Sequence, residues 1–367
     1  MSERWILQFC HCHYGPFLDV ARQYAALFKG SPYKVLTVYL TDKPSEAART
    51  GSASDEVIFL DYDSKAVRGL KLSAIRALRK IAASRDFALV IAHRAKPIYI
   101  ACLATNLPVI GVQHSFGDYH RAARRWFANR FRQRLSLLGV SDAVRDDMRR
   151  YLPNWPADRI ETLHNRLDVE ACRREILARK DARAALGLPD EAKIIGNVGR
   201  LHPDKDQKTL LAGFAQALPH LPPGTLLAIA GSGRLEADLK AQAQASGIAQ
   251  QVIFLGQVPE IWRLFAAFDL FVLSSDHEPF GMVLLEAMAA NVPIMATDCG
   301  GAPEIVTDDN ALFPLGDSRA LAEKLTTFFS APPAGEAPLD RLKERFSDEA
   351  ARRRFFALPM VQKALGS

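Results

Sequence analysis

The chain has 367 residues, 49% of them hydrophobic, and its 47 lysines and arginines exceed its 41 aspartates and glutamates by six charges. This length predicts two domains rather than one, and the apolar content is enough for two cores. No apolar run is long enough for a membrane span, and five cysteines without framework spacing exclude a disulfide-stabilised scaffold. Since no secretory signal pattern follows the first residues, we expect a cytoplasmic protein.

Positive charge is concentrated in the first half of the chain. Residues 1–165 carry a net charge of +10, whereas residues 166–367 carry a net charge of −4. A basic first half beside a mildly acidic second half predicts a polyanionic partner for the first. A phosphorylated acceptor, an anionic membrane surface and nucleic acid all meet this description.

The first half alternates between short β-like runs and amphipathic helical stretches, which predicts a parallel, doubly wound sheet. The helical stretches include 17–28, 67–83 and 119–132. The expected strands are 5–10, 34–40, 56–60, 87–92, 108–113, 135–140 and 159–163.

The loop after the first expected strand carries a Cys-His-Cys-His run at 10–13, which has the residue types of a zinc site. Neighbouring residues on a strand point to opposite faces, however, and no second pair of ligands follows downstream. We therefore expect no metal here. With Gly15 preceding a helix-opening Pro16, the loop is interpreted as the mouth of a cleft. The Asp-Tyr-Asp sequence at 61–63 is interpreted as a turn.

Two expected strands of this half are followed directly by histidine. A lone histidine is usually a hydrogen-bonded structural residue, and that interpretation is favoured for His93. His114 follows the strand at 108–113 and precedes small residues. Because strand ends are where ligands bind in α/β sheets, a functional role for His114 stands equally open.

A basic run that contains only arginine follows, with Trp126, Phe127 and Phe131 at helical spacing. A solvated helix face explains such a run most simply, and contact with phosphates or membrane headgroups is the alternative. Nucleic acid is not expected, because no nucleic-acid-binding motif accompanies the run. The arginines assigned to an acceptor or membrane surface are Arg121, Arg124, Arg125 and Arg130.

A polar connector at 164–168 marks the expected boundary between a first domain, 1–165, and a second, 166–335. A linker rich in proline and alanine at 331–338 leads into a basic, helix-prone C-terminal segment, 336–367. In the second domain we expect helices at 169–186 and 318–329 and strands at 193–200, 226–230, 252–255, 269–273, 292–296 and 310–313.

The strongest signals lie between residues 274 and 306. A buried strand ends in a loop that begins at Glu278, and a helix follows from Met282. Such a turn lies at the carboxyl end of a parallel strand, where ligands bind, and the helix N-terminus favours an anion. Glu278 and Glu286, with seven residues between them, flank that helix start. A phosphate held between two carboxylates that bind hydroxyls fits a nucleotide-sugar.

Two cations follow an earlier strand end. Arg200 ends the strand at 193–200, and Lys205 follows five residues later. A loop lysine is usually only solvated, but a pair of cations beside a helix N-terminus can clamp a diphosphate. Gly231 opens a tight glycine turn, which is a weak signal alone, and exposed backbone near Val258 can meet a base edge.

These motifs resemble those of the retaining glycosyltransferases of family 4. Glu278 and Glu286 reproduce the Glu-x7-Glu motif of the family, and Arg200 with Lys205 matches its phosphate-binding pair. His114 matches the histidine of the first domain more loosely. The chain departs from the pattern in carrying Asp206 and Asn291 where glycine is usual.

The resemblance implies a fold and a set of roles. The fold is GT-B, an α/β architecture of two facing Rossmann-like domains with parallel sheets, in which the segment 336–367 crosses back to pack on the first domain. Glu286 would bind the ribose hydroxyls, and the role of Glu304 depends on how its loop folds. The implied catalytic residues are Glu278, His114, Arg200 and Lys205. The implied donor-binding residues are Glu286, Phe280, Gly281, Met282, Val283, Val258, Gly231 and Gly15.

By the same resemblance, the expected function is transfer of a hexose, with retention, from a nucleotide-sugar to a hydroxyl of an anionic cell-envelope glycan or glycolipid, such as the lipopolysaccharide core. UDP-hexose is favoured as the donor. No metal or other cofactor is expected, because two cations and a helix N-terminus offset the charge of the leaving diphosphate. Attachment to the inner face of the cytoplasmic membrane stays open. The alternatives are a nucleotide-sugar epimerase of the same fold and an inert nucleotide-sugar-binding protein.

Overall fold

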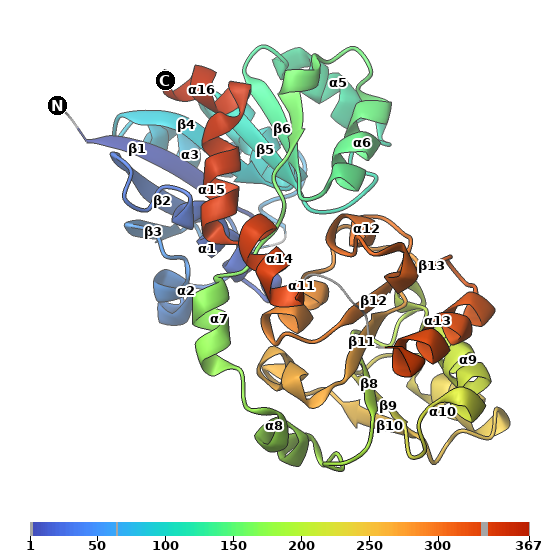
Figure 1. Ribbon diagram of the computed structural model, residues 1–367. Coiled ribbons are helices and arrows are strands. Elements are labelled where there is room, and N and C mark those ends of the chain that lie inside the picture. The colour runs from blue at the N-terminus through green and yellow to red at the C-terminus, as the bar shows by residue number, and fades with distance from the viewer. Residues whose placement is uncertain (1–2, 64, 332–336, 367) are drawn as a thin grey trace. The chain divides into compact units, whose positions relative to one another are not determined.

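The chain forms two compact units (Figure 1). The computed structural model describes residues 3–63, 65–331 and 337–366. The first unit runs to Arg166 and also includes the residues from Asp348 onward, and the second runs from Leu167 to Ser347. The division after Arg166 falls one residue beyond the boundary expected from the sequence.

In the described residues of the first unit, seven parallel strands form a sheet in the order β3-β2-β1-β4-β5-β6-β7. Helices lie on both faces of this sheet (Figure 1), so β4 is buried along its whole length. The strands are β1 (Arg4–Cys10), β2 (Tyr33–Tyr39), β3 (Glu56–Phe59), β4 (Phe87–His93), β5 (Val109–Gln113), β6 (Leu135–Gly139) and β7 (Ile160–Thr162). The helices are α1 (Pro16–Ala26), α2 (Glu46–Gly51), α3 (Leu72–Ala82), α4 (Ala95–Ala104), α5 (Ala122–Phe131), α6 (Asp142–Tyr151), α15 (Asp348–Ala357) and α16 (Pro359–Leu365).

The second unit repeats the plan. Its described strands form a parallel six-stranded sheet in the order β10-β9-β8-β11-β12-β13. The strands are β8 (Ile194–Val198), β9 (Leu226–Ala230), β10 (Val252–Gly256), β11 (Leu270–Leu273), β12 (Ile294–Thr297) and β13 (Leu312–Phe313). The helices are α7 (Val169–Glu175), α8 (Arg179–Leu186), α9 (Gln207–Ala217), α10 (Glu236–Ala245), α11 (Met282–Ala289), α12 (Ala302–Ile305), α13 (Ser318–Ser330) and α14 (Pro338–Arg345).

Both sheets change direction at their first strand. In the first unit the chain moves outward from β1 through β2 and β3, and then returns to place β4 on the other side of β1. In the second unit β8 lies between β9 and β11 in the same way. The loops after the two strands at such a switch point run to opposite faces of the sheet, which leaves a crevice at their carboxyl ends.

One expected helix, 169–186, is two helices. The chain leaves α7 at Ile176, whose backbone is extended, and the Leu177 N–H donates to the Arg263 carbonyl oxygen at 2.8 Å. In α8 the buried Arg183 donates to an Asp269 carboxylate oxygen at 2.9 Å. The composition of this stretch predicts helix, and most of it is helical, but tertiary contacts divide the helix in two.

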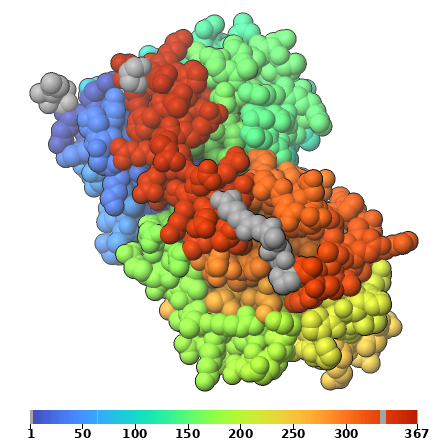
Figure 2. All heavy atoms as spheres, in the orientation of Figure 1, coloured from blue at the N-terminus to red at the C-terminus, as the bar shows by residue number. Residues whose placement is uncertain are grey.

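The C-terminal segment is shared between the units. The expectation was that all of 336–367 packs on the first domain. Helix α14 instead belongs to the second unit, where Phe346 at its end packs against Phe280 with 5.8 Å between ring centroids. Helices α15 and α16 belong to the first unit, where Phe355 packs against Phe28 at 5.6 Å between ring centroids. Figure 2 shows the red C-terminal residues against blue residues of the first unit. The linker residues 332–336 lie outside the described part of the chain.

Charged groups fix the start of α15 within the first unit. Asp348 accepts hydrogen bonds from Arg22 at 3.0 Å and from Arg166 at 2.8 Å. The Arg166 side chain is 1% exposed, so the arginine of this ion pair is buried. Loss of one partner from such a pair leaves an uncompensated buried charge, which explains why the segment stays attached. Among the described helices, none has both the length and the apolar character that crossing a bilayer requires.

Candidate active site

The crevice of the second sheet brings together the two loops with the strongest sequence motifs. Arg200 and Lys205 follow β8, and the loop that contains Glu278 follows the neighbouring strand β11. Gly231 follows β9, and Val258 follows β10. The residues predicted to bind the donor therefore lie along the carboxyl edge of four adjacent strands.

A charged cluster lies at these strand ends. The Lys205 Nζ is 2.8 Å from a Glu278 carboxylate oxygen, and both side chains are largely buried. The hydroxyl of Ser275 donates to the same carboxylate oxygen at 3.2 Å and lies 3.3 Å from the lysine nitrogen. A buried ion pair of this kind is stable only where further hydrogen bonds support it, and Ser275 supplies them. Sequence reasoning did not identify Ser275, although its position three residues before Glu278 in a loop was a usable signal.

Hydrogen bonds to backbone carbonyl oxygens join the two loops. The Ser274 hydroxyl donates to the Lys205 carbonyl oxygen at 2.8 Å, and the Asp276 N–H donates to the Asp204 carbonyl oxygen at 3.1 Å. The Thr297 hydroxyl, at the end of β12, holds the Ser275 carbonyl oxygen at 2.5 Å. Lys205 and Glu278 are thus positioned by main-chain contacts as well as by their own attraction.

Arg200 differs from Lys205 in being exposed. Its side chain is 71% exposed, and its guanidinium donates to Asp204 at 3.0 Å. Burial opposes ionisation of Asp204, but the hydrogen bond with His202 and the charges of Lys205 and Arg200 outweigh burial and lower its pKa. Asp204 is therefore ionised and holds Arg200 at the rim. No pattern in the sequence indicates this role of Asp204.

The N-terminus of α11 faces the same loops. No side chain caps its first turn, and no acidic residue is present there, so the N–H groups of Met282 and Val283 are available to an anion. Gly281 adopts a φ of 107°, which side-chain-bearing residues rarely do. The Phe280 side chain is buried against Phe346, so the structure gives it an anchoring role beside the donor-binding role predicted for it.

Glycine also permits close backbone approach behind this turn. A Cβ on Gly301 would lie 2.7 Å from the Pro279 carbonyl oxygen, and the Gly301 N–H donates to the Glu278 carbonyl oxygen at 2.8 Å. A Cβ on Gly231 would lie 1.9 Å from the Gly199 carbonyl oxygen. Gly231 is thus required for strand-end packing, whether or not it also contacts a ligand.

The second glutamate of the motif lies inside α11. Glu286 is half-buried in the second turn of the helix, eight residues after Glu278. Glu304 is half-buried in α12, and its carbonyl oxygen accepts a hydrogen bond from Arg341 at 3.2 Å.

The two departures from the family pattern occupy left-handed backbone positions. Asp206 has a φ of 41° and Asn291 a φ of 57°. Glycine is the usual residue at such positions, and aspartate and asparagine are the side chains that tolerate them best. Asp206 additionally caps α9 by accepting from the Thr209 N–H at 3.3 Å. These substitutions therefore preserve the backbone conformation.

The first unit has a second candidate site at the ends of β4 and β5. The His93 and His114 rings stack with 5.6 Å between centroids, and Nδ1 of His93 lies 3.4 Å from Nε2 of His114. Burial, assisted by the charge of Arg94, lowers the pKa of His114 to about 4. Burial lowers the pKa of His93 well below its usual value, with His114 adding to the effect. Both rings are therefore neutral at pH 7.

Arg94 is a residue that sequence reasoning missed. It follows β4 directly with φ 73° and ψ 163°, a conformation that is almost restricted to glycine. Its guanidinium lies 4.8 Å from the Phe17 ring centroid, and among the described residues it forms no ion pair. Strained backbone at a strand end is typical of ligand sites. Gly15, one of the implied donor-binding residues, has a φ of 55° just before α1.

The residues of the Cys-His-Cys-His run at 10–13 have different surroundings. Cys10 and Cys12 are buried, and burial raises the pKa of the Cys10 thiol to about 12. The ring Nε2 of His13 is 3.0 Å from the Lys43 carbonyl oxygen. Burial and the charges of Lys96 and Arg94 lower the pKa of His11 to about 4, so this ring too is neutral.

The four arginines around α5 are not equivalent. Arg124 pairs with the Asp118 carboxylate, and Arg125 donates to the Tyr119 carbonyl oxygen at 3.0 Å. Arg121 and Arg130 are exposed. Arg124 and Arg125 therefore stabilise the loop before α5, whereas Arg121 and Arg130 present their charge to solvent.

Comparisons with known proteins cover nearly the whole chain. The model for glycosyl transferases group 1 matches residues 178–353, and the model for glycosyltransferase family 4 matches residues 17–171. The lipopolysaccharide core biosynthesis mannosyltransferase LpsB of Rhizobium meliloti (strain 1021) is 30% identical over 192 residues, which is 49% of this chain and 55% of that protein. The D-inositol 3-phosphate glycosyltransferase of Mycobacterium marinum (strain ATCC BAA-535 / M) is 37% identical over 157 residues, which is 41% of this chain and 32% of that protein. The chain thus spans between about a third and just over half of the length of these curated relatives.

Solved structures resemble the entire chain. A glycosyltransferase from Rickettsia africae ESF-5 has a TM-score of 0.83 at 17% identity and covers 100% of this chain and 99% of its own. Anabaena Alr3699/HepE, in complex with UDP, has a TM-score of 0.77 at 21% identity and covers 95% and 97%. Together with the two parallel sheets, these structures confirm the predicted GT-B fold class. The two family models, which meet near the division between the units, show that the chain belongs to the glycosyltransferases of family 4, with a group 1 domain as its second half.

Proposed function

We propose that the chain transfers a hexose from a nucleotide-sugar to a hydroxyl of an anionic cell-envelope glycan or glycolipid, with the lipopolysaccharide core as the favoured acceptor. The observation that carries this proposal is the convergence of Lys205 and Ser275 on Glu278 beside the uncapped N-terminus of α11. This arrangement supplies positive charge for a diphosphate and a carboxylate for sugar hydroxyls within one crevice. UDP is favoured as the nucleotide of the donor, and the UDP complex of HepE supports that choice.

The proposed reaction breaks the bond between the anomeric carbon and the phosphate oxygen. Negative charge develops on the leaving diphosphate, where Lys205, Arg200 and the helix N–H groups stabilise it. We propose that these groups suffice without a metal ion. Arg200 is exposed and paired with Asp204, so it has to exchange Asp204 for phosphate when the donor binds.

We propose that the configuration at the anomeric carbon is retained. The acceptor oxygen attacks the anomeric carbon on the face that the diphosphate leaves, and the acceptor proton passes to a phosphate oxygen. Glu278 holds donor hydroxyls in this scheme and does not form a covalent bond. Glu286 binds the ribose, and His114, being neutral, accepts or donates a hydrogen bond to the donor sugar.

The acceptor side of the proposal rests on the charge of the first unit. Arg94, Arg121 and Arg130 are all exposed. These cations suit a phosphorylated acceptor or the headgroups of the cytoplasmic membrane. Peripheral attachment of a cytoplasmic protein to the inner face of that membrane is therefore part of the proposal.

A donor screen tests the function. The protein is melted in the presence of UDP-, GDP- and ADP-hexoses, since a ligand that binds the folded state raises the melting temperature. The best donor is then incubated with and without a phosphorylated core oligosaccharide, and the product is analysed by NMR. We expect transfer with the anomeric configuration of the donor. Because LpsB is named a mannosyltransferase, GDP-mannose is the donor that competes with UDP-hexose in this screen.

Matched variants separate the alternatives. Glu278→Gln is expected to abolish transfer, whereas Asp276→Asn, two residues earlier and exposed, is expected to retain it. Epimerised donor in the absence of any acceptor would replace the transferase proposal with an epimerase. Absence of both transfer and donor hydrolysis with every nucleotide-sugar would favour an inert binding protein.

A further inference from the structure

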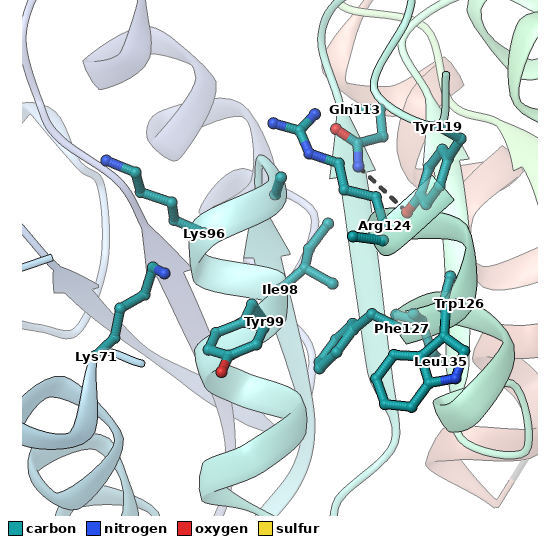
Figure 3. A pocket seen from close by; sticks show the side chains of 13 residues that line it. Lys71, Lys96, Ile98, Tyr99, Gln113, Tyr119, Arg124, Trp126, Phe127 and Leu135 are labelled. Atoms are coloured by element: carbon teal, nitrogen blue, oxygen red, sulfur yellow. Dashed lines mark hydrogen bonds between the residues drawn. The ribbon is translucent and has the colours of Figure 1, made fainter. Parts of the chain in front are cut away.

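A pocket of about 440 Å³ lies between α4 and α5 in the first unit (Figure 3). Its walls are mainly apolar: Ile98 and Tyr99 from α4 face Phe127 and Trp126 from α5. The Tyr99 and Phe127 rings are 4.9 Å apart between centroids. A mostly apolar cavity of this size is typical of a binding site for a small organic molecule.

One end of the pocket is polar. Figure 3 shows Gln113 and Arg124 together at this end, with Phe127, Trp126 and Leu135 toward the other. The Gln113 side chain is 1% exposed, and its amide nitrogen donates to the Tyr119 hydroxyl at 3.4 Å. Its amide oxygen has no hydrogen-bond partner among the described residues. A buried acceptor without a donor is costly, so a ligand hydroxyl at this point would be stabilised.

Two lysines line the pocket as well. The Lys71 ammonium lies 4.8 Å from the Tyr99 ring centroid and donates to the Gly69 carbonyl oxygen at 2.6 Å, and in the described chain neither Lys71 nor Lys96 forms an ion pair. Burial and the charge of Lys96 lower the pKa of Lys71. The two ammonium groups repel each other. An anion placed between them would be attracted by both and would offset this repulsion.

The residues beside the pocket are unusually apolar for an exposed surface. Leu70 is 67% exposed, Leu72 is 53% exposed, and these residues flank Lys71. Trp126, which lines the pocket, is 69% exposed. These are three of the five large hydrophobic side chains that are most exposed in the described chain. Exposed leucine and tryptophan interleaved with lysine are typical of a surface that enters the headgroup layer of a membrane.

We propose that this pocket holds one acyl chain of an anionic membrane lipid, with the headgroup beside Lys71 and Lys96 and the chain between α4 and α5. The apolar walls match the chain, the lysines match the phosphate, and Gln113 matches a headgroup hydroxyl. The inference deepens the membrane contact that is part of the proposed function and rests on it. The membrane contact is then a defined binding site for a lipid tail, and not only adsorption of a basic protein to an anionic surface.

Trp126 provides a direct test. The chain has four tryptophans, and Trp126 is the one that lines the pocket. Its fluorescence is measured with vesicles of phosphatidylcholine mixed with phosphatidylglycerol whose acyl chains carry bromine, a contact quencher, and Trp126→Phe identifies its share of the signal. We expect quenching of Trp126 by the brominated anionic lipid and none when the vesicles contain phosphatidylcholine alone. Vesicle binding that leaves Trp126 unquenched, or an absence of binding, would overturn the proposal.

Two pairs of variants locate the effect in the pocket. Ala123→Leu places a larger side chain inside it, whereas Ala122→Leu makes the same change one residue earlier on α5, outside the lining. Lys71→Glu with Lys96→Glu removes the paired cations, and Lys80→Glu is the control on the exposed face of α3. We expect Ala123→Leu and the double lysine variant each to weaken binding to the anionic vesicles by about tenfold or more, while both controls retain it. Equal binding by Ala122→Leu and Ala123→Leu would show adsorption to the surface only. Should Ala123→Leu melt below its control, the lysine pair decides the outcome.

Failure of this inference can be told apart from failure of the proposed function. Donor hydrolysis and transfer to a soluble core oligosaccharide are measured on the wild-type chain in parallel with the vesicles. Activity without Trp126 quenching overturns the lipid site and leaves the transferase. Quenching without any activity supports the lipid site and overturns the transferase.

Discussion

The two units have crevices at the same topological position, but the charges beside these crevices are paired differently. In the second unit, Lys205 is paired with Glu278, and hydrogen bonds to backbone carbonyl oxygens tie the two surrounding loops together. In the first unit, His93 and His114 are neutral, and Arg94 is exposed on a strained backbone and forms no ion pair among the described residues. The second crevice is internally compensated before any ligand arrives, whereas the first leaves a cation for its ligand to neutralise. The same sheet order thus determines where a site lies, and the loop residues determine which ligand it suits.

The largest expected effect tests the compensated crevice. Lys205→Ala removes the charge opposite the leaving diphosphate and leaves Glu278 buried without its cation. We expect transfer to fall by roughly 10²–10³-fold, the loss typical when one stabilising group of a developing oxyanion is removed. Steady-state kinetics with the preferred donor measures this, and the exposed Lys208→Ala on α9 is the matched control. Near-wild-type turnover by Lys205→Ala would remove the diphosphate role from this residue.

A smaller effect is expected in the uncompensated crevice. Arg94→Gly relieves a backbone conformation that suits glycine, so the melting temperature should stay level or rise. Transfer to a phosphorylated acceptor should fall by roughly tenfold to a hundredfold, because a charge-assisted hydrogen bond is lost. Donor hydrolysis should be unchanged. A loss of stability together with unchanged transfer would mean that Arg94 is structural.

The pH dependence of stability should come mainly from the first unit. The folded-state pKa values of His11 and His114 are about 4, below the usual 6.5 that holds in the unfolded chain. Between these values the unfolded chain binds more protons, so the free energy of unfolding is highest above pH 6.5 and falls as the pH decreases toward 4. Melting curves across this range should show a weaker dependence for His114→Gln than for the exposed control His220→Gln. An equal dependence in both variants would contradict the assignment.

The smallest effect is expected at a departure from the family pattern. Asn291→Gly restores the usual residue at a left-handed position, and we expect the stability to change by no more than about 0.5 kcal/mol. Asn291→Ala should be less stable than either, since alanine tolerates a φ of 57° poorly. Chemical denaturation measures all three. A large gain from glycine would show that asparagine strains this turn.

Much of the fold followed from local patterns. The alternation of apolar runs and helix-forming stretches predicted both parallel sheets, and the polar connector at 164–168 brackets the division after Arg166. The helix predicted at 169–186 is interrupted because Leu177 bonds to Arg263, and that contact joins residues far apart in the sequence. The C-terminal segment is divided for the same reason, since Phe346 packs on Phe280.

The sequence by itself determined which residues are proposed for the donor chemistry, because Glu278, Glu286, Arg200 and Lys205 occur at spacings set by strand ends and a helix start. Only the tertiary structure decided how they are held: Lys205 against Glu278 and Ser275, and Arg200 against Asp204. It also showed Arg94 and the pocket between α4 and α5. A strained φ and a cavity arise from the packing of distant segments, and no local pattern of residues encodes them.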